Sequence, residues 1–143
     1  MERKADMVSH YKDLAVYQKA TTLRREVFAS SKGWPKEERY SLTDQVRRSS
    51  RSIGANIAEA WAKRRYPKHF VSKLTDALAE GEETIVWIDT AYECSYIDTE
   101  VHSDLTRTTR QICGGLVRMM RSPDSWCGPS GIARETPHPY EVD

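Results

Sequence analysis

The fold of this chain is decided by residues 45–61, QVRRSSRSIGANIAEAW. In a helix, which turns about 100° per residue, this segment and the turn before it gather apolar and small residues within roughly 80°. The row consists of Leu42, Val46, Ser49, Ile53, Ile57 and Ala60. So narrow a row predicts an amphipathic helix that packs against other helices.

A second row, made of polar residues, lies beside the apolar row on the same helix. Its members are Gln45, Arg48, Ser52, Asn56 and Glu59. Their spacing of three, four, four and three residues is more orderly than a solvated face requires. We therefore expect this row to contact a neighbouring helix or a neighbouring subunit, and we see no catalytic pattern in it.

Three further segments repeat apolar residues with helical spacing, and no segment alternates convincingly as a strand does. The expected helices cover residues 13–31, 41–63, 67–94 and 99–121. Short connections between them predict an all-α fold, an antiparallel up-down four-helix bundle. The bundle should span residues 11–122, between a disordered N-terminal tail at 1–10 and a flexible C-terminal tail at 123–143 that is rich in proline and glycine.

The expected helix ends carry capping signals. Asp13 and Ser41 are suited to cap the first two helices, with Asp44 completing an imperfect capping box. Asp98 or Thr99 should cap the fourth helix.

Two residues of the third helix, Pro67 and Gly81, predict how the helix begins and how it packs. Pro67 suits a first helical turn, where its missing N–H costs nothing. Gly81 lies within the apolar row, although glycine costs about 1 kcal/mol relative to alanine inside a helix. We therefore expect a neighbouring helix to approach closely at Gly81.

Charge is strongly segregated along the chain, although 22 basic and 21 acidic residues leave a net charge of only +1. Residues 39–73 contain nine basic and two acidic residues, a net charge of +7. Residues 74–104 contain nine acidic residues and no lysine or arginine, a net charge of −9. Segments of opposite sign can form opposite faces of one molecule.

Two basic clusters are candidate binding surfaces. The fourth helix places four arginines together on its polar side: Arg107, Arg110, Arg118 and Arg121. This face is interpretable as solvated, as phosphate-binding, or as paired with an acidic helix. The second cluster, Lys63, Arg64, Arg65 and Lys68, bridges the end of the second helix and the start of the third. The helix dipole alone favours cations at the end of the second helix.

The acidic third helix presents apolar residues outside its apolar row. Glu80 and Glu83 lie on one flank with Trp87, and Val86 lies nearby. A tryptophan beside a row of carboxylates is a candidate contact with another subunit. The carboxylates lack a histidine at ligand spacing, so we expect no metal site and no cofactor.

Several classes of protein are excluded by absent signals. No apolar run is long enough to span a membrane, and the N-terminus lacks a signal-peptide core. Cys94, Cys113 and Cys127 form no C-x-x-C pair, which is typical of reduced structural thiols and favours a cytoplasmic location. The chain contains no phosphate-binding loop and no nucleophile motif, so we expect it not to be an enzyme.

Four stretches of the chain together resemble a known family. They are YKDLAVYQKA, WPKEERYSLTDQVRRSSRSIGANIAEA, AEGEETIVWIDTAYECSYI and LVRMMRSPDSWCG, within residues 11–128. They resemble the bacterial four-helix-bundle proteins of the ribosomal-RNA intervening-sequence type, also called the S23 family. One departure is Ala60, where many relatives carry glycine, and a methyl group there should only adjust helix packing.

The resemblance implies a bundle that assembles into a ring of five subunits. A related branch is the accessory variability determinant of diversity-generating retroelements, a basic barrel that binds nucleic acid and a reverse transcriptase. By that resemblance, Arg47, Arg48, Arg51 and residues 63–65 become candidates for contact with RNA or DNA. Two hypotheses remain open: a nucleic-acid-associated oligomer, and an oligomeric scaffold in which arginines pair with the acidic helix of the next subunit.

Overall fold

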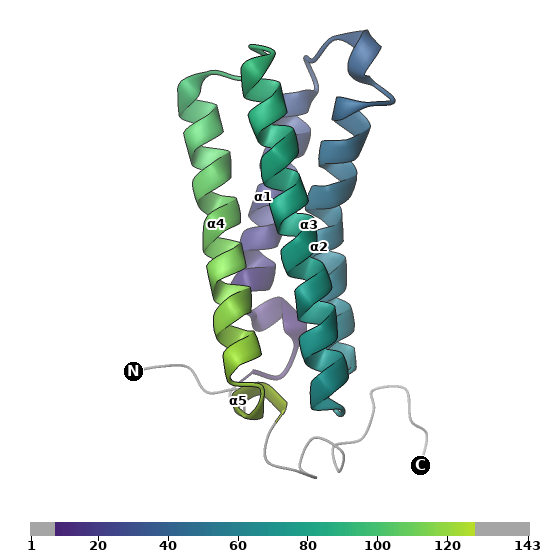
Figure 1. The fold of residues 1–143 in the computed structure, drawn as a ribbon, viewed down its shortest axis with the longest axis vertical. Coiled ribbons are helices and arrows are strands. Elements are labelled where there is room, and N and C mark those ends of the chain that lie inside the picture. Colours follow the sequence, from purple (N-terminus) through teal and green to yellow (C-terminus); the bar gives the residue numbers. More distant parts are fainter. Residues whose placement is uncertain (1–7, 128–143) are drawn as a thin grey trace.

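Four long helices lie side by side in the computed structural model, which describes residues 8–127 (Figure 1). They are α1 (Ala15–Ser31), α2 (Leu42–Ala62), α3 (Pro67–Glu93) and α4 (Thr99–Arg121). Three short helical pieces accompany them: η2 (Tyr11–Asp13), η3 (Lys36–Glu38) and α5 (Asp124–Cys127). The described part of the chain contains no strand, so the predicted all-α class is confirmed.

Each long helix reverses the direction of the one before it. In Figure 1 the α1–α2 and α3–α4 connections lie at the upper end, and the α2–α3 connection lies at the lower end. Contacts join α1 to α2, α2 to α3, α3 to α4 and α4 back to α1. This arrangement leaves one face of every helix directed to solvent.

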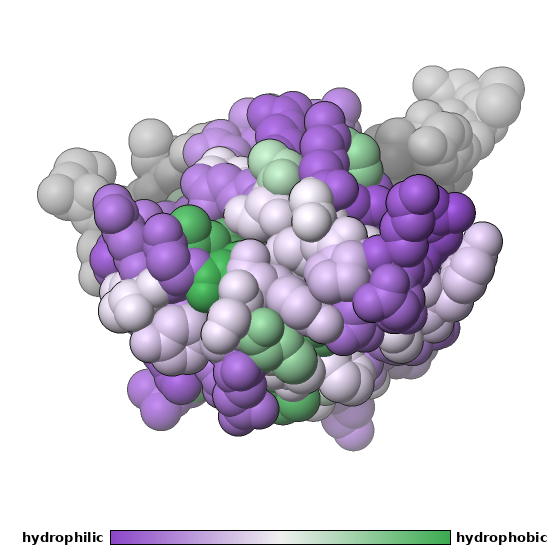
Figure 2. Space-filling model, turned by 90° about the horizontal axis from the view of Figure 1, so that it is seen from above, coloured by the Kyte–Doolittle hydropathy of each residue, from purple (hydrophilic) through white to green (hydrophobic). Residues whose placement is uncertain are grey.

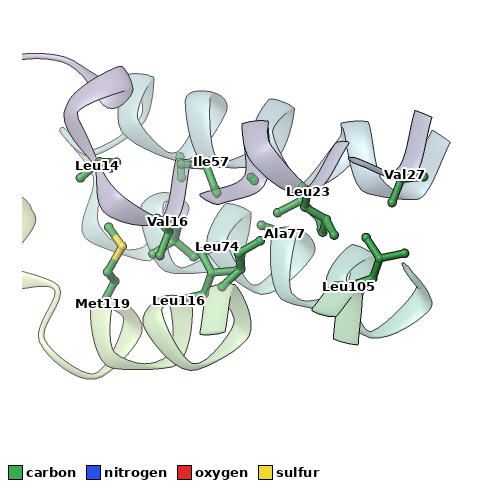
Figure 3. Close-up of a cluster of buried hydrophobic side chains, with 14 of the residues drawn as sticks. Leu14, Val16, Leu23, Val27, Ile57, Leu74, Ala77, Leu105, Leu116 and Met119 are labelled. Carbon is green, nitrogen blue, oxygen red and sulfur yellow. The ribbon is translucent and has the colours of Figure 1, made fainter. Parts of the chain in front are cut away.

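The core is formed by apolar side chains from all four helices. Leu23, Ile57, Leu74 and Leu116 are completely buried along the bundle axis (Figure 3). All six members of the apolar row on α2 are buried, as the spacing predicts. The core is therefore made by narrow stripes, which leaves broad polar faces outside.

One polar pair lies inside the core between α2 and α3. The Oγ1 atom of Thr84 is 2.8 Å from Ser49 Oγ and 2.8 Å from the carbonyl oxygen of Glu80. Both residues are buried, so their hydroxyl groups satisfy each other or the helix backbone. The serine in the predicted core row thus serves as a hydrogen-bonding contact across helices.

The predicted helix ends are confirmed in part. The Asp98 carboxylate accepts a hydrogen bond from Val101 N at 2.8 Å, and Pro67 lies in the first turn of α3. The prediction for Asp13 is wrong, because α1 begins two residues later, after the 3₁₀ turn η2. Leu14 occupies the N-cap position there and supplies no capping side chain.

The start of α2 is capped from outside the helix. Ser41 occupies the predicted N-cap position, but its hydroxyl donates to Glu38 Oε1 at 2.7 Å instead of capping the backbone. The Glu38 carboxylate also accepts from Leu42 N at 3.4 Å and from the Tyr96 hydroxyl at 2.9 Å. The Ser41 and Tyr96 hydrogen bonds lower the pKa of Glu38, and the same carboxylate raises the pKa of Tyr96 to about 12. Glu38 therefore ties the α1–α2 connection to the α3–α4 connection.

The two ends of the described chain pack onto the bundle. Val8 is buried, although it belongs to the predicted N-terminal tail. Residues 123–127 were expected in the C-terminal tail, yet α5 places Cys127 in the core, where burial raises the pKa of its thiol to about 11. The rest of both predicted tails, residues 1–7 and 128–143, lies outside the described residues.

The described surface is mainly polar. Seen from above, hydrophilic residues surround the end of the bundle, and hydrophobic areas between them are small (Figure 2). Five large apolar or aromatic side chains are exposed: Phe28, Tyr40, Tyr66, Val86 and Tyr92. Within residues 8–127 no helix combines the length and hydropathy needed to cross a bilayer.

The close approach predicted at Gly81 is confirmed. A methyl group added there would lie 2.7 Å from Cys113 Sγ on α4. Both residues are buried, so neither helix can move aside without disturbing the core. Gly81 therefore sets the distance between α3 and α4.

Replacing Gly81 by alanine should destabilise the bundle, although alanine is the better helix former. Overpacking costs about 1–3 kcal/mol, against a gain in helix propensity of about 1 kcal/mol. We expect a net loss of about 1 kcal/mol in the free energy of unfolding, measured by urea denaturation. In the double variant Gly81→Ala/Cys113→Ala, removal of the sulfur should recover part of the loss.

Gly114 provides the matched control within α4. A methyl group there would meet nothing closer than Arg118 Nη1 at 3.6 Å. Gly114→Ala should therefore raise the free energy of unfolding by up to about 1 kcal/mol. Equal stability of Gly81→Ala and wild type would contradict the close contact between α3 and α4.

Replacing Glu38 by glutamine should lower the Tm at pH 7, because an amide accepts weaker hydrogen bonds than a carboxylate. The folded-state pKa of Glu38 lies below its ordinary value. Its stabilisation is therefore complete above the ordinary pKa of about 4.3 and is lost as the pH falls through the lower folded-state pKa. The difference in Tm between wild type and Glu38→Gln should accordingly shrink in acid, as thermal melts followed by circular dichroism will report.

The exposed neighbour Glu37 is the control, because it makes no side-chain hydrogen bond within residues 8–127. Glu37→Gln should leave the Tm and its pH dependence close to wild type. If both variants behave alike, the carboxylate of Glu38 does not cap α2.

Candidate nucleic-acid interface

The four arginines predicted on one face of the fourth helix all point outward from α4. Arg107, Arg110, Arg118 and Arg121 are exposed. One of them has a partner, since Arg107 Nη2 lies 2.6 Å from Asp104 Oδ1 one turn away. This pair is itself exposed, and exposed pairs of this kind contribute little to stability.

The outward face of α4 is hollowed over about 660 Å³. Cations line it from α4 and also from Lys19 of α1. The full lining is Lys19, Thr99, His102, Ser103, Thr106, Arg107, Arg110, Gln111, Gly114 and Arg118. It includes hydroxyl groups and an amide but no carboxylate, so its hydrogen-bonding groups and its charge both suit an anion.

Two residues shape this hollow. Gly114 has open space where a side chain would begin, apart from Arg118. Thr106 Oγ1 is buried without a hydrogen-bond partner among the described residues. We name this surface, with the lining given above, the α4 basic face.

On α2, the candidates Arg47 and Arg51 lean over α1. Their guanidinium carbons lie 4.6 Å and 5.7 Å from the centroid of the Phe28 ring. Arg47 Nε also donates to Ser31 Oγ at 2.8 Å. The side chain of Arg47 is therefore fixed in position and lies half-buried between the two helices.

A second hollow of about 520 Å³ lies on the outward side of α2. Its lining is Arg39, Thr43, Asp44, Arg47, Arg48, Arg51, Ser52 and Ala55. Four arginines against one aspartate leave this hollow strongly positive. We name it the α2 hollow.

The polar row of α2 lies along the seam with α3 of the same chain. Glu59 Oε2 is 2.6 Å from Lys73 Nζ, a hydrogen bond that raises the pKa of Lys73. Ser52 and Asn56 donate to carbonyl oxygens one turn back on α2. Of the row's two alternatives, the neighbouring helix thus accounts for Glu59, while the half-buried Gln45 makes no side-chain hydrogen bond within residues 8–127.

Glu80 on α3 connects the same seam to the acidic face. Burial raises its pKa first, and the neighbouring Glu83 raises it further, whereas Ser52 and the charge of Arg48 oppose the shift. The two carboxylates are thus close enough to disfavour full ionisation of both. The charge of Arg48 thus acts on a carboxylate of the same subunit.

Of the two apolar candidates on α3, only Val86 is well exposed, at 54%. Trp87 is half-buried against the core, and its Nε1 donates to Glu83 Oε1 at 3.3 Å. Another subunit could therefore contact the whole exposed side chain of Val86, but only the edge of the Trp87 indole.

The cluster at residues 63–65 is divided between exposed and structural groups. Lys63 is exposed at the end of α2. Arg64 lies with its guanidinium carbon 4.3 Å from the Trp61 ring centroid and donates to the Trp61 carbonyl at 3.1 Å. Burial lowers the pKa of Arg64, and Arg65 is half-buried. Arg64 therefore completes the end of the helix, as the dipole explanation expects.

Among the cations that line the two hollows, Lys19 and Arg39 were not predicted. Beside the α2 hollow, Phe28 and Lys32 were also not predicted, and the Lys32 ammonium lies 5.0 Å from the centroid of the Phe28 ring. Phe28 on α1 and Lys32 at its C-cap are four residues apart, so their proximity was readable from the spacing. Their meeting with arginines of α2 depends on how α1 and α2 pack, which spacing within one helix does not specify.

Comparisons with known proteins agree with this fold. A family model described as 23S rRNA-intervening sequence protein matches residues 12–118. A solved structure from Bacteroides thetaiotaomicron, a protein of unknown function from the S23 ribosomal protein family, is 24% identical to this chain with a TM-score of 0.67. The match covers 75% of this chain and 99% of that chain, and at this identity it shows a shared fold alone. Among curated proteins, none matches. Because the family model spans most of its length, this chain belongs to the 23S rRNA-intervening sequence protein family, the S23 family.

Proposed function

We propose that this protein is a non-enzymatic, nucleic-acid-associated accessory protein that works as an oligomer, a homopentamer. RNA or DNA binds along the α4 basic face, and a protein partner such as a reverse transcriptase completes the complex. The observation that carries this proposal is a hollow lined by three arginines and a lysine without any carboxylate.

The chemistry of the α4 basic face matches a phosphate backbone. Arginine presents a planar fork of donors that fits phosphate oxygens, and hydroxyl and amide groups supply the remaining hydrogen bonds. From Arg107 to Arg118 the arginines of this face extend over about 17 Å along the helix. A row of this length contacts several successive phosphates, whereas a single small anion would use only one end.

The low net charge of the chain is compatible with such binding. The acidic residues are concentrated between positions 74 and 104, mostly on α3, and none of them lines the α4 basic face. A ring would repeat the α4 basic face once in every subunit, and several weak contacts on one strand add up through their effective concentration. For binding of nucleic acid, the distribution of charge over the surface therefore matters more than the net charge of the chain.

Salt dependence tests the assignment to the α4 basic face. Binding of a single-stranded RNA, measured by fluorescence anisotropy, should weaken with salt, because each neutralised phosphate releases counterions. The variant Arg110→Gln/Arg118→Gln should bind more weakly at about 50 mM salt and lower the slope of log K against log salt by about 0.7 for each arginine that contacts a phosphate.

Arg25 offers a matched control, an exposed arginine on α1 that belongs to neither hollow. Arg25→Gln should leave the slope unchanged. The proposal fails if neither RNA nor DNA binds wild type at about 50 mM salt, or if the double variant keeps the full slope.

A second function, that of a protein scaffold, is favoured by the acidic α3. Val86 is exposed between carboxylates, while the α2 hollow presents four arginines. A ring needs two different complementary surfaces on each subunit, and these two are complementary in charge. In this alternative the arginines of α2 hold subunits together and bind no nucleic acid.

Changing Arg47, Arg48 and Arg51 to glutamate separates the two functions. The scaffold alternative predicts that the oligomer dissociates, because like charges would face acidic α3 across the interface. The nucleic-acid proposal, which places RNA on the α4 basic face, predicts an intact oligomer that still binds RNA. Light scattering measures the assembly and anisotropy the binding, while circular dichroism verifies that the variant is folded.

A further inference from the structure

Three cations converge on one aromatic ring at the seam between α1 and α2. The guanidinium carbons of Arg47 and Arg51 and the ammonium of Lys32 lie 4.6, 5.7 and 5.0 Å from the centroid of Phe28. We name this group of four residues the Phe28 cluster. Cation–π contact holds the charges near a ring that is itself 38% exposed.

The cluster is held from inside the fold. Arg47 Nε donates to Ser31 Oγ at 2.8 Å, and Ser31 is only 2% exposed. The Ser31 hydroxyl is in turn 3.1 Å from the carbonyl oxygen of Phe28. At least one of the three cations is thus positioned before any ligand arrives, which reduces the entropy lost on binding.

The positive charge of the cluster is not neutralised by neighbours. Within residues 8–127, no carboxylate lies at ion-pair distance from Lys32, Arg47 or Arg51. The end of α1 is nearby, but a helix C-terminus carries only about half a negative charge. More than two positive charges therefore remain at one point on the surface.

The cluster also borders open space. Arg47 and Arg51 line the α2 hollow together with Arg39 and Arg48, and Asp44 is its one acidic lining residue. An anion placed there could reach both guanidinium forks, which bind phosphate oxygens in pairs. Convergent charge and an adjacent hollow are separate observations that indicate the same kind of ligand.

We propose that the Phe28 cluster binds a terminal phosphate, a monoester group at the end of a nucleic-acid strand. A phosphate monoester carries about −1.5 to −2 charges at pH 7, against one for each backbone diester. Cations gathered at one point favour the more highly charged group, whereas the extended α4 basic face suits a chain of diesters. That the ligand is a nucleic-acid strand rests on the proposed function. That the Phe28 cluster prefers a phosphate monoester does not depend on the proposed function.

The test compares strands that differ only at their ends. One short single-stranded RNA, labelled internally, is prepared with a 5′-phosphate, with a 3′-phosphate and with neither. We expect a phosphorylated strand to bind wild type about fivefold more tightly than the hydroxyl-ended strand at about 50 mM salt, as measured by fluorescence anisotropy. Equal affinity for all three strands would overturn the proposal and leave the α4 basic face unaffected.

Two variants test whether the preference for phosphorylated strands comes from the Phe28 cluster. Arg51→Gln removes one exposed cation, and Phe28→Leu keeps all three charges while removing the ring that positions them. Both should bring the ratio of Kd values for hydroxyl-ended and phosphorylated strands close to one. Arg25→Gln removes the same charge from a nearby turn of α1 and should keep the ratio, so a ratio lost equally in this control contradicts the assignment.

A nucleoside monophosphate separates this proposal from the proposed function. If no strand binds, yet the nucleotide raises the Tm of wild type and not of Arg51→Gln, the Phe28 cluster is a monoester site and the nucleic-acid function fails. If neither strands nor nucleotide bind, both proposals fail. Circular dichroism of each variant verifies that the bundle is folded in every comparison.

Discussion

Burial of a narrow apolar stripe on each helix is the constraint on which the rest of this structure depends. On α2 that stripe occupies roughly 80° of the helix circumference, and every member of it is buried. The stripe fixes which side of α2 meets α1 and which meets α3. The core consequently also determines which way the surface residues of each helix face, including the exposed arginines of α4.

The close approach of α3 and α4 shows the same dependence at atomic detail. Because Gly81 has no side chain, the sulfur of Cys113 occupies the space where a methyl group would lie. The tighter packing brings the acidic helix and the arginine-bearing helix together along one edge. Their charges nevertheless remain on separate faces, since the arginines point away from the contact and the carboxylates of α3 flank it or face solvent.

Sequence periodicity predicted the fold well, because the helical repeat and the core stripe are local properties of each segment. The apolar row of α2, the start of α3 at Pro67 and the cap at Asp98 all follow from spacing or from one residue's chemistry. The cap of α2 did not, because it comes from Glu38, which belongs to the preceding turn and is fixed by Tyr96 far along the chain. Interactions that join distant segments require the packed structure.

The same limit explains which parts of the candidate site were predictable. The arginines of α4 share a face by spacing alone, so their exposure could be anticipated. The role of Phe28 in the site could not be predicted, because it depends on arginines of α2 that lie over its ring only in the packed structure. A row of cations on one helix and a cluster shared between two helices differ in how they present charge. The first distributes it along a line and the second concentrates it at a point, which is why we propose a chain of diesters as the ligand of one and a terminal phosphate as the ligand of the other.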